Sequence, residues 1–398
     1  MRFFMIFAVL GACCIFFMPL AHAENIAPGN QIENRSLPVE NLRQLLVAKD
    51  FKLLNSKIDQ LQKDFEKDFR QEGKLTSALY DFELNNPKFK PLLDEWAAKT
   101  PNDFAPFLCR GVYSFTRGAN ARGARYTSET SATAFESMEQ FNQSAIMDFR
   151  EALELRPTLI HPYAYLIRIS SVGGDREDQK QYFNFAIKMN PYSILLRQVY
   201  LSKLAPRWGG SLVEMQAVVE ESREHIQKYP QLRIVESELD IEAGMQAIEE
   251  KDYAAAISHL TKAISKGESA IAYFRRGQSY MYNKQHALAV CDFNRAIALN
   301  PTYIMAHEFL LSCDKQLKQA YPVIKADLDR LLELSPKAEY YYQRGVLRGW
   351  YLEGETEYAA SDLEEATKLA PANKEYKDIL AAFLKMQGER SDLKKSAK

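Results

Sequence analysis

One segment of this sequence recurs along the chain, and this repetition constrains the fold more than any other feature. Residues 145–157 return at residues 289–301 and, more weakly, at residues 359–371. Small, aromatic and proline residues keep the same offsets in the first two copies: Ala145, Phe149 and Pro157 correspond to Ala289, Phe293 and Pro301. A recurring helical unit with small residues at its contact points stacks on copies of itself. The repetition therefore predicts an all-α fold, an α-solenoid of antiparallel helix pairs.

Prolines mark the ends of these units, because each follows an apolar-periodic helix and stops it. They are Pro157, Pro191, Pro230, Pro301, Pro336 and Pro371. Most are about 35 residues apart, and the one wide gap fits about two units. A unit of this length made of two short helices is similar to the tetratricopeptide repeat. The best match carries the family's aromatic, Gly, Ala and Pro positions at Tyr273, Gly277, Tyr280, Ala289, Phe293, Ala296 and Pro301. The resemblance implies a binding scaffold more than a catalyst.

Charged residues in three units recur as a pair. Where Arg precedes the repeat glycine of the first helix, Asp occupies a fixed position in the second. The pairs are Arg110 with Asp148, Arg276 with Asp292, and Arg344 with Asp362. A guanidinium group matches a carboxylate through two parallel hydrogen bonds, so we expect partly buried ion pairs between facing helices. These residues are interpreted as structural.

The N-terminus has the pattern of a secretory signal peptide. Arg2 is followed by an apolar run to Leu20 and by Ala21-His22-Ala23, a small-x-small cleavage site. We expect a bacterial protein that is periplasmic or secreted, begins near Glu24 and has no transmembrane segment after cleavage. A lipoprotein signal with lipidated Cys13 is the less favoured alternative.

The remaining chain divides by pattern. The predicted order is a signal peptide (1–23), a flexible leader (24–40), an N-terminal helical domain (41–228), tetratricopeptide repeats (229–371), a capping helix (372–388) and a disordered tail (389–398). Residues 40–228 resemble a bacterial domain family of unassigned function. That resemblance rests on an Ala-Arg-Gly insertion and the turn Pro206-Arg-Trp-Gly-Gly-Ser211, and it implies a fold but no activity.

Two departures from the repeat are candidate binding elements. Residues 117–138 form an insertion between the helices of one unit, with Arg117, Arg122 and Arg125 close together. Long insertions in solenoids commonly decorate the binding face, although an extended helix with a surface loop fits equally well. Trp208 could stack on a ligand, although filling a gap between units is favoured. The alternative function is therefore an enzyme or small-ligand binder that uses this insertion and Trp208.

The favoured binding surface is the concave face of the first helices. In tetratricopeptide-like units, certain positions of these helices face the groove rather than the core. The groove candidates are Ile241, Met245, Ile248, Ile271, Phe274, Gln278, Met281, Tyr282, Tyr342, Val346 and Trp350. Rigid aromatic and adaptable Met side chains suit a peptide groove. The competing interpretation is that the superhelix closes and buries them.

Chemical motifs are missing from the sequence. It has no phosphate-binding loop, nucleophile elbow or zinc-binding helix, and its histidines lie singly. We therefore predict no catalytic residue, metal or cofactor. With 51 Lys and Arg against 52 Asp and Glu, the net charge of -1 gives no field that would attract nucleic acid. The predicted partner is a protein or peptide, whether in the envelope or on another cell.

Overall fold

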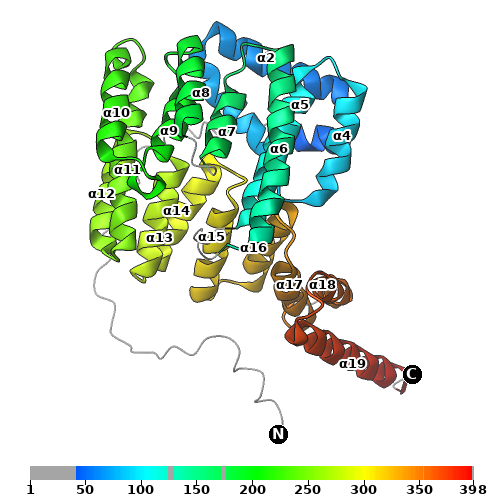
Figure 1. Cartoon of the computed structure of the whole chain (residues 1–398). Helices are drawn as coiled ribbons and strands as arrows, with labels where there is room; N and C mark the ends of the chain where they lie inside the picture. The colour runs from blue at the N-terminus through cyan, green and yellow to red at the C-terminus, as the bar shows by residue number, and fades with distance from the viewer. Residues whose placement is uncertain (1–41, 124–129, 172–175, 353, 397–398) are drawn as a thin grey trace. The chain divides into compact units, whose positions relative to one another are not determined.

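A computed structural model describes the chain over residues 42–123, 130–171, 176–352 and 354–396 (Figure 1). Within these ranges every regular element is an α-helix or a short 3-10 helix. The all-α prediction is confirmed. The signal peptide, Cys13, the leader and Arg125 lie outside the described residues. In the described part, no helix is long and apolar enough to cross a membrane.

In the described residues, seven helix pairs form the solenoid, each with a first helix, A, and a second helix, B. In order they are α5 (Phe104–Arg122) and α6 (Ala132–Leu155), α7 (His161–Ser170) and α8 (Arg176–Met189), α9 (Ile194–Lys203) and α10 (Leu212–Ile226), α11 (Ser237–Glu249) and α12 (Tyr253–Lys266), α13 (Ala270–Tyr282) and α14 (His286–Leu299), α15 (Ile304–Gln316) and α16 (Tyr321–Leu334), and α17 (Ala338–Trp350) and α18 (Thr356–Leu369). The two helices of each pair contact each other, as consecutive labels in Figure 1 show.

Further elements precede the pairs, one lies within a pair, between α9 and α10, and one joins two pairs, between α10 and α11. They are α1 (Leu42–Val47), α2 (Phe51–Lys67), η1 (Phe69–Gln71), α3 (Glu72–Leu79), η2 (Tyr80–Phe82), η3 (Pro87–Phe89), α4 (Lys90–Lys99), η5 (Pro206–Trp208) and η6 (Pro230–Glu236). The predicted boundary at 228/229 falls just before η6, which contacts both α10 and α11, so packing is continuous across it.

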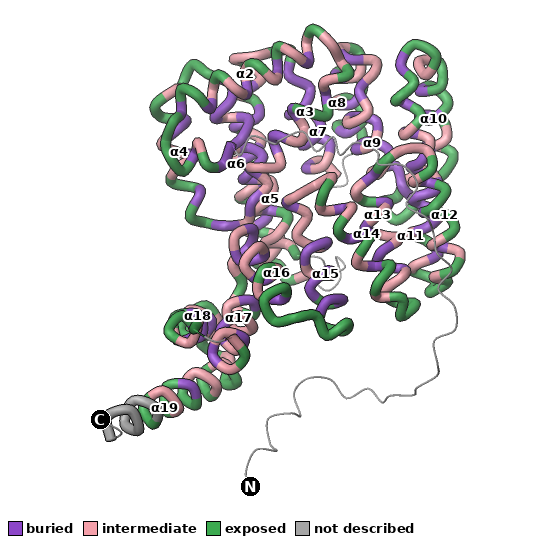
Figure 2. The backbone as a smooth tube through the Cα atoms, turned by 180° about the vertical axis from the view of Figure 1, so that it is seen from behind, coloured by how far each residue is buried: buried purple, intermediate pink, exposed green. Residues whose placement is uncertain are grey.

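Close approach of the two helices explains the small residues of the repeat. A Cβ atom on Gly277 would lie 2.8 Å from the Phe293 ring, a separation that real Cβ atoms do not adopt. Ala289 on the facing helix is fully buried. In Figure 2 buried residues alternate with exposed residues along the helices, as expected where one face of each helix packs on its neighbours.

The first helices of the chain also contact α16, far away in the sequence. The Asn85 amide donates to the Leu334 carbonyl at 3.0 Å, and the Asn85 side chain donates to the Ser335 hydroxyl at 2.9 Å. Arg43 forms an ion pair with Glu333. Leu334 is fully buried in the same apolar core as the N-terminal helices. These contacts close one turn of the solenoid between residues 43 and 335.

The last unit is covered by α19 (Lys374–Ser396), as the predicted capping helix requires. Phe383 is its fully buried anchor, with its ring 5.3 Å from that of Trp350. The predicted disordered tail is wrong as far as Ser396, because α19 continues through most of it. Lys and Glu residues favour helix strongly, so the charged composition of the tail does not prevent helix formation.

Candidate partner-binding surface

The three predicted Arg–Asp pairs are present, each as a two-pronged contact. Arg276 donates from Nε and a terminal nitrogen to the two carboxylate oxygens of Asp292, both at 2.8 Å. Arg110 reaches Asp148 at 2.7 Å, and Arg344 reaches Asp362 at 2.7 Å. The three Asp residues are buried. The pairs therefore join helix A to helix B and offer no free charge to a ligand.

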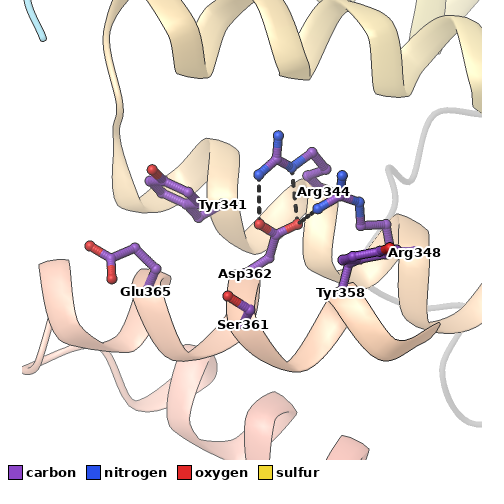
Figure 3. Close-up of a pocket in the computed structure, with 7 residues that line it drawn as sticks. All are labelled: Tyr341, Arg344, Arg348, Tyr358, Ser361, Asp362 and Glu365. Carbon is purple, nitrogen blue, oxygen red and sulfur yellow. Dashed lines mark hydrogen bonds and ion pairs between the residues drawn. The ribbon is translucent and has the colours of Figure 1, made fainter. Parts of the chain in front are cut away.

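A hollow of about 320 Å³ lies at the last pair, and Figure 3 shows the residues that line it. Its lining residues are Tyr341, Arg344, Arg348, Tyr358, Ser361, Asp362 and Glu365. Asp362 accepts hydrogen bonds from both Arg344 and Arg348. Arg348 also donates to Glu355 at 3.0 Å. Both guanidinium groups are thus engaged by carboxylates, and the hollow is part of the helix-to-helix contact.

The groove prediction is wrong for three residues of α11 and α13. Phe274 is fully buried, and its ring lies 4.9 Å from that of Tyr303 and 5.3 Å from that of Phe309. Ile241 and Gln278 are also buried. The reason is that neighbouring A helices contact each other directly, so these positions face the next unit. Substituting Phe274 would test folding rather than binding.

The prediction is also wrong for the last unit, where α19 covers the candidates. Tyr342 stacks on Tyr376 at 4.6 Å and donates to Glu375 at 2.8 Å. Val346 and Trp350 pack against the apolar cluster around Phe383. The helix that follows this unit, α19, packs on α17 in the place of a next A helix. These side chains are the contact surface for the cap.

Other groove candidates remain accessible. Ile271 and Tyr282, at the two ends of α13, are 38% and 43% exposed. Met245, Ile248 and Met281 are half-buried on α11 and α13. The Tyr282 ring lies 5.4 Å from that of Tyr253 on the preceding unit. Large apolar side chains are therefore open to solvent on this A-helix face.

The insertion lengthens both helices of its unit. Residues 117–122 belong to α5 and residues 132–138 to α6. The Arg117 guanidinium lies 5.1 Å from the Phe141 ring and donates to Tyr113 at 3.2 Å. Arg122 lies 5.7 Å from the Phe135 ring. Both arginines are thus used to hold α5 on α6, which favours the extended-helix interpretation of this segment.

Trp208 lies in the tight turn between α9 and α10 and is 47% exposed. Gly209 has a positive φ of 83°. A Cβ on Gly210 would lie 2.0 Å from the Leu204 carbonyl oxygen, so only glycine fits there. The Lys203 ammonium lies 5.2 Å from the Trp208 ring centroid. The interpretation that Trp208 fills a gap between units is therefore wrong, because nearly half of its side chain is exposed. Trp208 is presented beside a cation.

The described residues bear on two kinds of chemical site, a metal centre and a cysteine nucleophile. No three His, Cys, Asp or Glu side chains among the described residues gather as metal ligands. Cys109 is fully buried, and burial raises the pKa of its thiol. A thiolate nucleophile is therefore disfavoured at this position.

The sequence comparison identifies one repeat directly. Residues 270–303 match the family model of the tetratricopeptide repeat, and this match covers α13 and α14, the unit with the best pattern. No curated protein shows significant similarity to the chain. The chain thus contains tetratricopeptide repeats, whereas the resemblance of residues 40–228 to a family of unassigned function stays a prediction.

Solved structures with similar folds are distant. YrrB, described as a tetratricopeptide-repeat protein with an unusual peptide-binding site, is 18% identical over 51% of this chain and 97% of its own, with a TM-score of 0.32. Part of a repeat protein from Cytophaga hutchinsonii is 15% identical over 59% and 93%, with a TM-score of 0.33. A human IFIT1 dimer with m7Gppp-AAAA is 14% identical over 90% and 82%, with a TM-score of 0.34. At such TM-scores these likenesses do not bear on this chain's partner.

Proposed function

We propose that this solenoid of tetratricopeptide repeats is an interaction scaffold that binds a protein or peptide partner along its A-helix face. The observation that carries the proposal is the exposure of Ile271 and Tyr282 on α13, within the unit that matches the repeat family. Exposed aromatic and apolar side chains on a rigid element are the residues that dominate binding energy at protein interfaces.

Site-specific crosslinking tests this proposal. A photoreactive phenylalanine analogue at Tyr282 is expected to capture a protein partner in the producing cell, and Ile271→Ala should lower the yield. The same analogue at Leu288, which is 47% exposed on the B helix of the same unit, is the matched control. Equal capture from both positions, or none from Tyr282, would contradict the proposal.

The test also separates ligand classes. The sequence-based expectation that nucleic acid is not a partner rests on the net charge of -1 alone. A crosslink from Tyr282 to RNA, or to a small molecule, would replace the protein partner proposed here.

Export is the second part of the proposal. It rests on the sequence from Arg2 to Ala23, which has the charge, apolar run and small residues of a cleaved signal. N-terminal sequencing of the protein from the periplasm or culture fluid is expected to begin near Glu24. Recovery of the bulk of the protein from the cytoplasm with Met1 in place would overturn export. A lipid on Cys13 would overturn cleavage after Ala23.

A further inference from the structure

Four basic side chains come from three A helices and one short turn that the repeat pattern did not connect. They are Arg168 on α7, Lys203 at the end of α9, Arg207 in η5 and Arg275 on α13. In the structure α7 contacts α9, α9 contacts α11, and α11 contacts α13 (Figure 1). We call these four residues the cationic cluster. Only Arg207 could be noticed from the sequence, through its place next to Trp208.

The elements that carry these residues contact one another in turn, and Arg207 follows Lys203 by four residues, so the four charges lie on neighbouring elements. Burial, together with the positive charges of Arg168 and Arg207, lowers the pKa of Lys203 to about 8. Burial likewise lowers the pKa of Arg275, and Arg207 is again among the charges that contribute. Like charges gathered in a partly desolvated region favour an anionic ligand, which would relieve their repulsion.

Acidic residues compensate only part of this charge. Arg207 forms an ion pair with Glu242. A second acidic residue near Arg207 is Glu238, and burial raises the pKa of this carboxyl to about 7. Glu83 lies within electrostatic reach of Arg168, and Glu249 within reach of Arg275.

Two cations of the cluster, Lys203 and Arg275, have hydrogen-bond donors that no acidic side chain of the described residues accepts. No acidic side chain contributes to the pKa of Lys203. Among the described residues, neither Lys203 nor Arg275 forms an ion pair. The Nε of Arg275 is buried and has no hydrogen-bond partner, while its terminal nitrogen donates only to Gln278, at 3.0 Å. Arg275 therefore keeps hydrogen-bonding capacity that its own chain does not use.

Trp208 adds an apolar contact beside these donors. Its turn is fixed by Gly209 and Gly210, and its ring is half exposed next to the Lys203 ammonium. Ile271 and Tyr282 are exposed on α13, the helix that carries Arg275. Cationic and aromatic side chains therefore alternate along neighbouring A-helix elements.

We infer that the partner of this face is an extended acidic peptide segment, whose carboxylates bind Lys203 and Arg275 and whose apolar side chains contact Trp208 and Tyr282. This inference rests on the proposed scaffold function and adds the chemistry of the ligand. Charge complementarity favours a peptide rich in Asp or Glu, and an extended chain can reach several A helices in succession.

Fluorescence anisotropy of the full chain with defined peptides tests the inference. The probes are a short labelled peptide of alternating Glu and Tyr, and matched peptides with Gln or Lys in place of Glu. We expect the Glu peptide to bind at least tenfold more tightly than the Gln peptide, and the Lys peptide not to bind. The double variant Lys203→Gln with Arg275→Gln should lose at least tenfold in affinity for the Glu peptide. Its affinity for the Gln peptide should not change.

The control is an equal loss of charge elsewhere. Lys180→Gln with Lys377→Gln removes two exposed cations from other surfaces and should leave binding of the Glu peptide unchanged. Circular dichroism checks that each variant is folded. If the double variant at Lys203 and Arg275 unfolds, Lys203→Gln alone carries the test.

Several outcomes overturn the inference in distinguishable ways. Equal binding of the Glu and Gln peptides, lost on Tyr282→Ala, would keep the scaffold function and refute the acidic ligand. If no peptide binds but Tyr282 crosslinks to a protein, the acidic ligand is again refuted and the scaffold function is kept. If no peptide binds and Tyr282 gives no crosslink, the scaffold function is refuted as well. Tighter binding of an oligonucleotide than of the Glu peptide, lost with Lys203 and Arg275, would assign the cluster to nucleic acid.

Discussion

At the scale of single residues, the repeat arginines do more than the sequence predicted. Each guanidinium pairs with Asp on its own B helix and also donates to a side chain on a preceding helix. These further acceptors are Asp94 for Arg110, Thr261 for Arg276 and Asp329 for Arg344, at 3.1, 3.1 and 2.6 Å. The pairing within a unit could be predicted because both residues keep fixed offsets. The contact with the preceding helix was not predicted; its acceptor is Asp in two cases and Thr in the third.

Replacing Asp362 with Ala removes the carboxylate that Arg344 and Arg348 share. We expect a loss of about 3 kcal/mol in the free energy of unfolding, because two part-buried guanidinium groups lose that partner. Urea denaturation followed by circular dichroism measures the change. Glu364→Ala on the exposed side of the same helix should change stability by less than about 0.5 kcal/mol. Similar losses in both variants would show that the pairing contributes little.

Two aspartates on α16 have opposite pKa shifts. Burial, and then the nearby Asp314 carboxylate, raises the pKa of Asp327 to about 7. Burial also acts on Asp329, but hydrogen bonds from Arg344 and Lys325 outweigh it and lower the pKa. The pKa of Asp in an unfolded chain is about 4. At pH values between about 4 and about 7, the folded chain therefore holds a proton on Asp327 that the unfolded chain has lost. Stability from this group is therefore present at low pH and is lost as the pH rises to about 7.

Asp327→Asn should therefore gain stability over the parent protein between about pH 4 and about pH 8, by on the order of 1–2 kcal/mol. Asp329→Asn is the matched comparison and should behave oppositely. Its parent carboxylate stabilises the fold at neutral pH, and this contribution is lost only as the pH falls through the lowered pKa. Urea titrations across this pH range measure both effects. Parallel pH profiles for the two variants would rule out the opposite shifts.

At the scale of elements, the cap α19 determines which A-helix face is covered. The ring of Phe383 fills the space above Gly349, where a Cβ would come within 2.8 Å of it. Phe383→Ala is expected to cost about 3 kcal/mol and to speed amide hydrogen exchange in α17 and α18. Leu384→Ala removes a neighbouring side chain that is 45% exposed and should cost far less. Equal exchange in the two variants would mean that α19 does not stabilise the last pair.

The repeat pattern predicts the helix pairs, but it does not predict which part of the binding face is exposed. Gly277 and Ala289 mark close contacts inside a unit, and such contacts need small residues wherever they occur. The repeat pattern assigns every unit the same exposed positions. It does not state what lies next to each unit. Phe274 is buried by the following A helix, and Tyr342 is half-buried against the cap; both neighbours depend on tertiary packing.

At the scale of the whole solenoid, the closure between the first helices and α16 is the feature that the repeat pattern did not predict. Arg43 contacts Asp81 at 3.5 Å and also pairs with Glu333. Arg43→Ala should loosen the closure and speed exchange of the Asn85 amide about tenfold, which corresponds to about 1.4 kcal/mol. Lys49→Ala, which removes a surface pair with Glu95, is the control. Unchanged exchange at Asn85 in both variants would show that Arg43 does not hold the closure.

The same closure restricts how the gene for this chain can change in length. An open repeat array gains or loses units freely, because each unit contacts only its neighbours. Here one added pair before α16 would shift Leu334 away from Asn85 by roughly 10 Å, the separation of packed helices, and would break their 3.0 Å hydrogen bond. Duplication or deletion of a unit is therefore disfavoured between residues 86 and 333. Beyond Ser335, where α17 and α18 follow the closed turn, the number of units is free to vary.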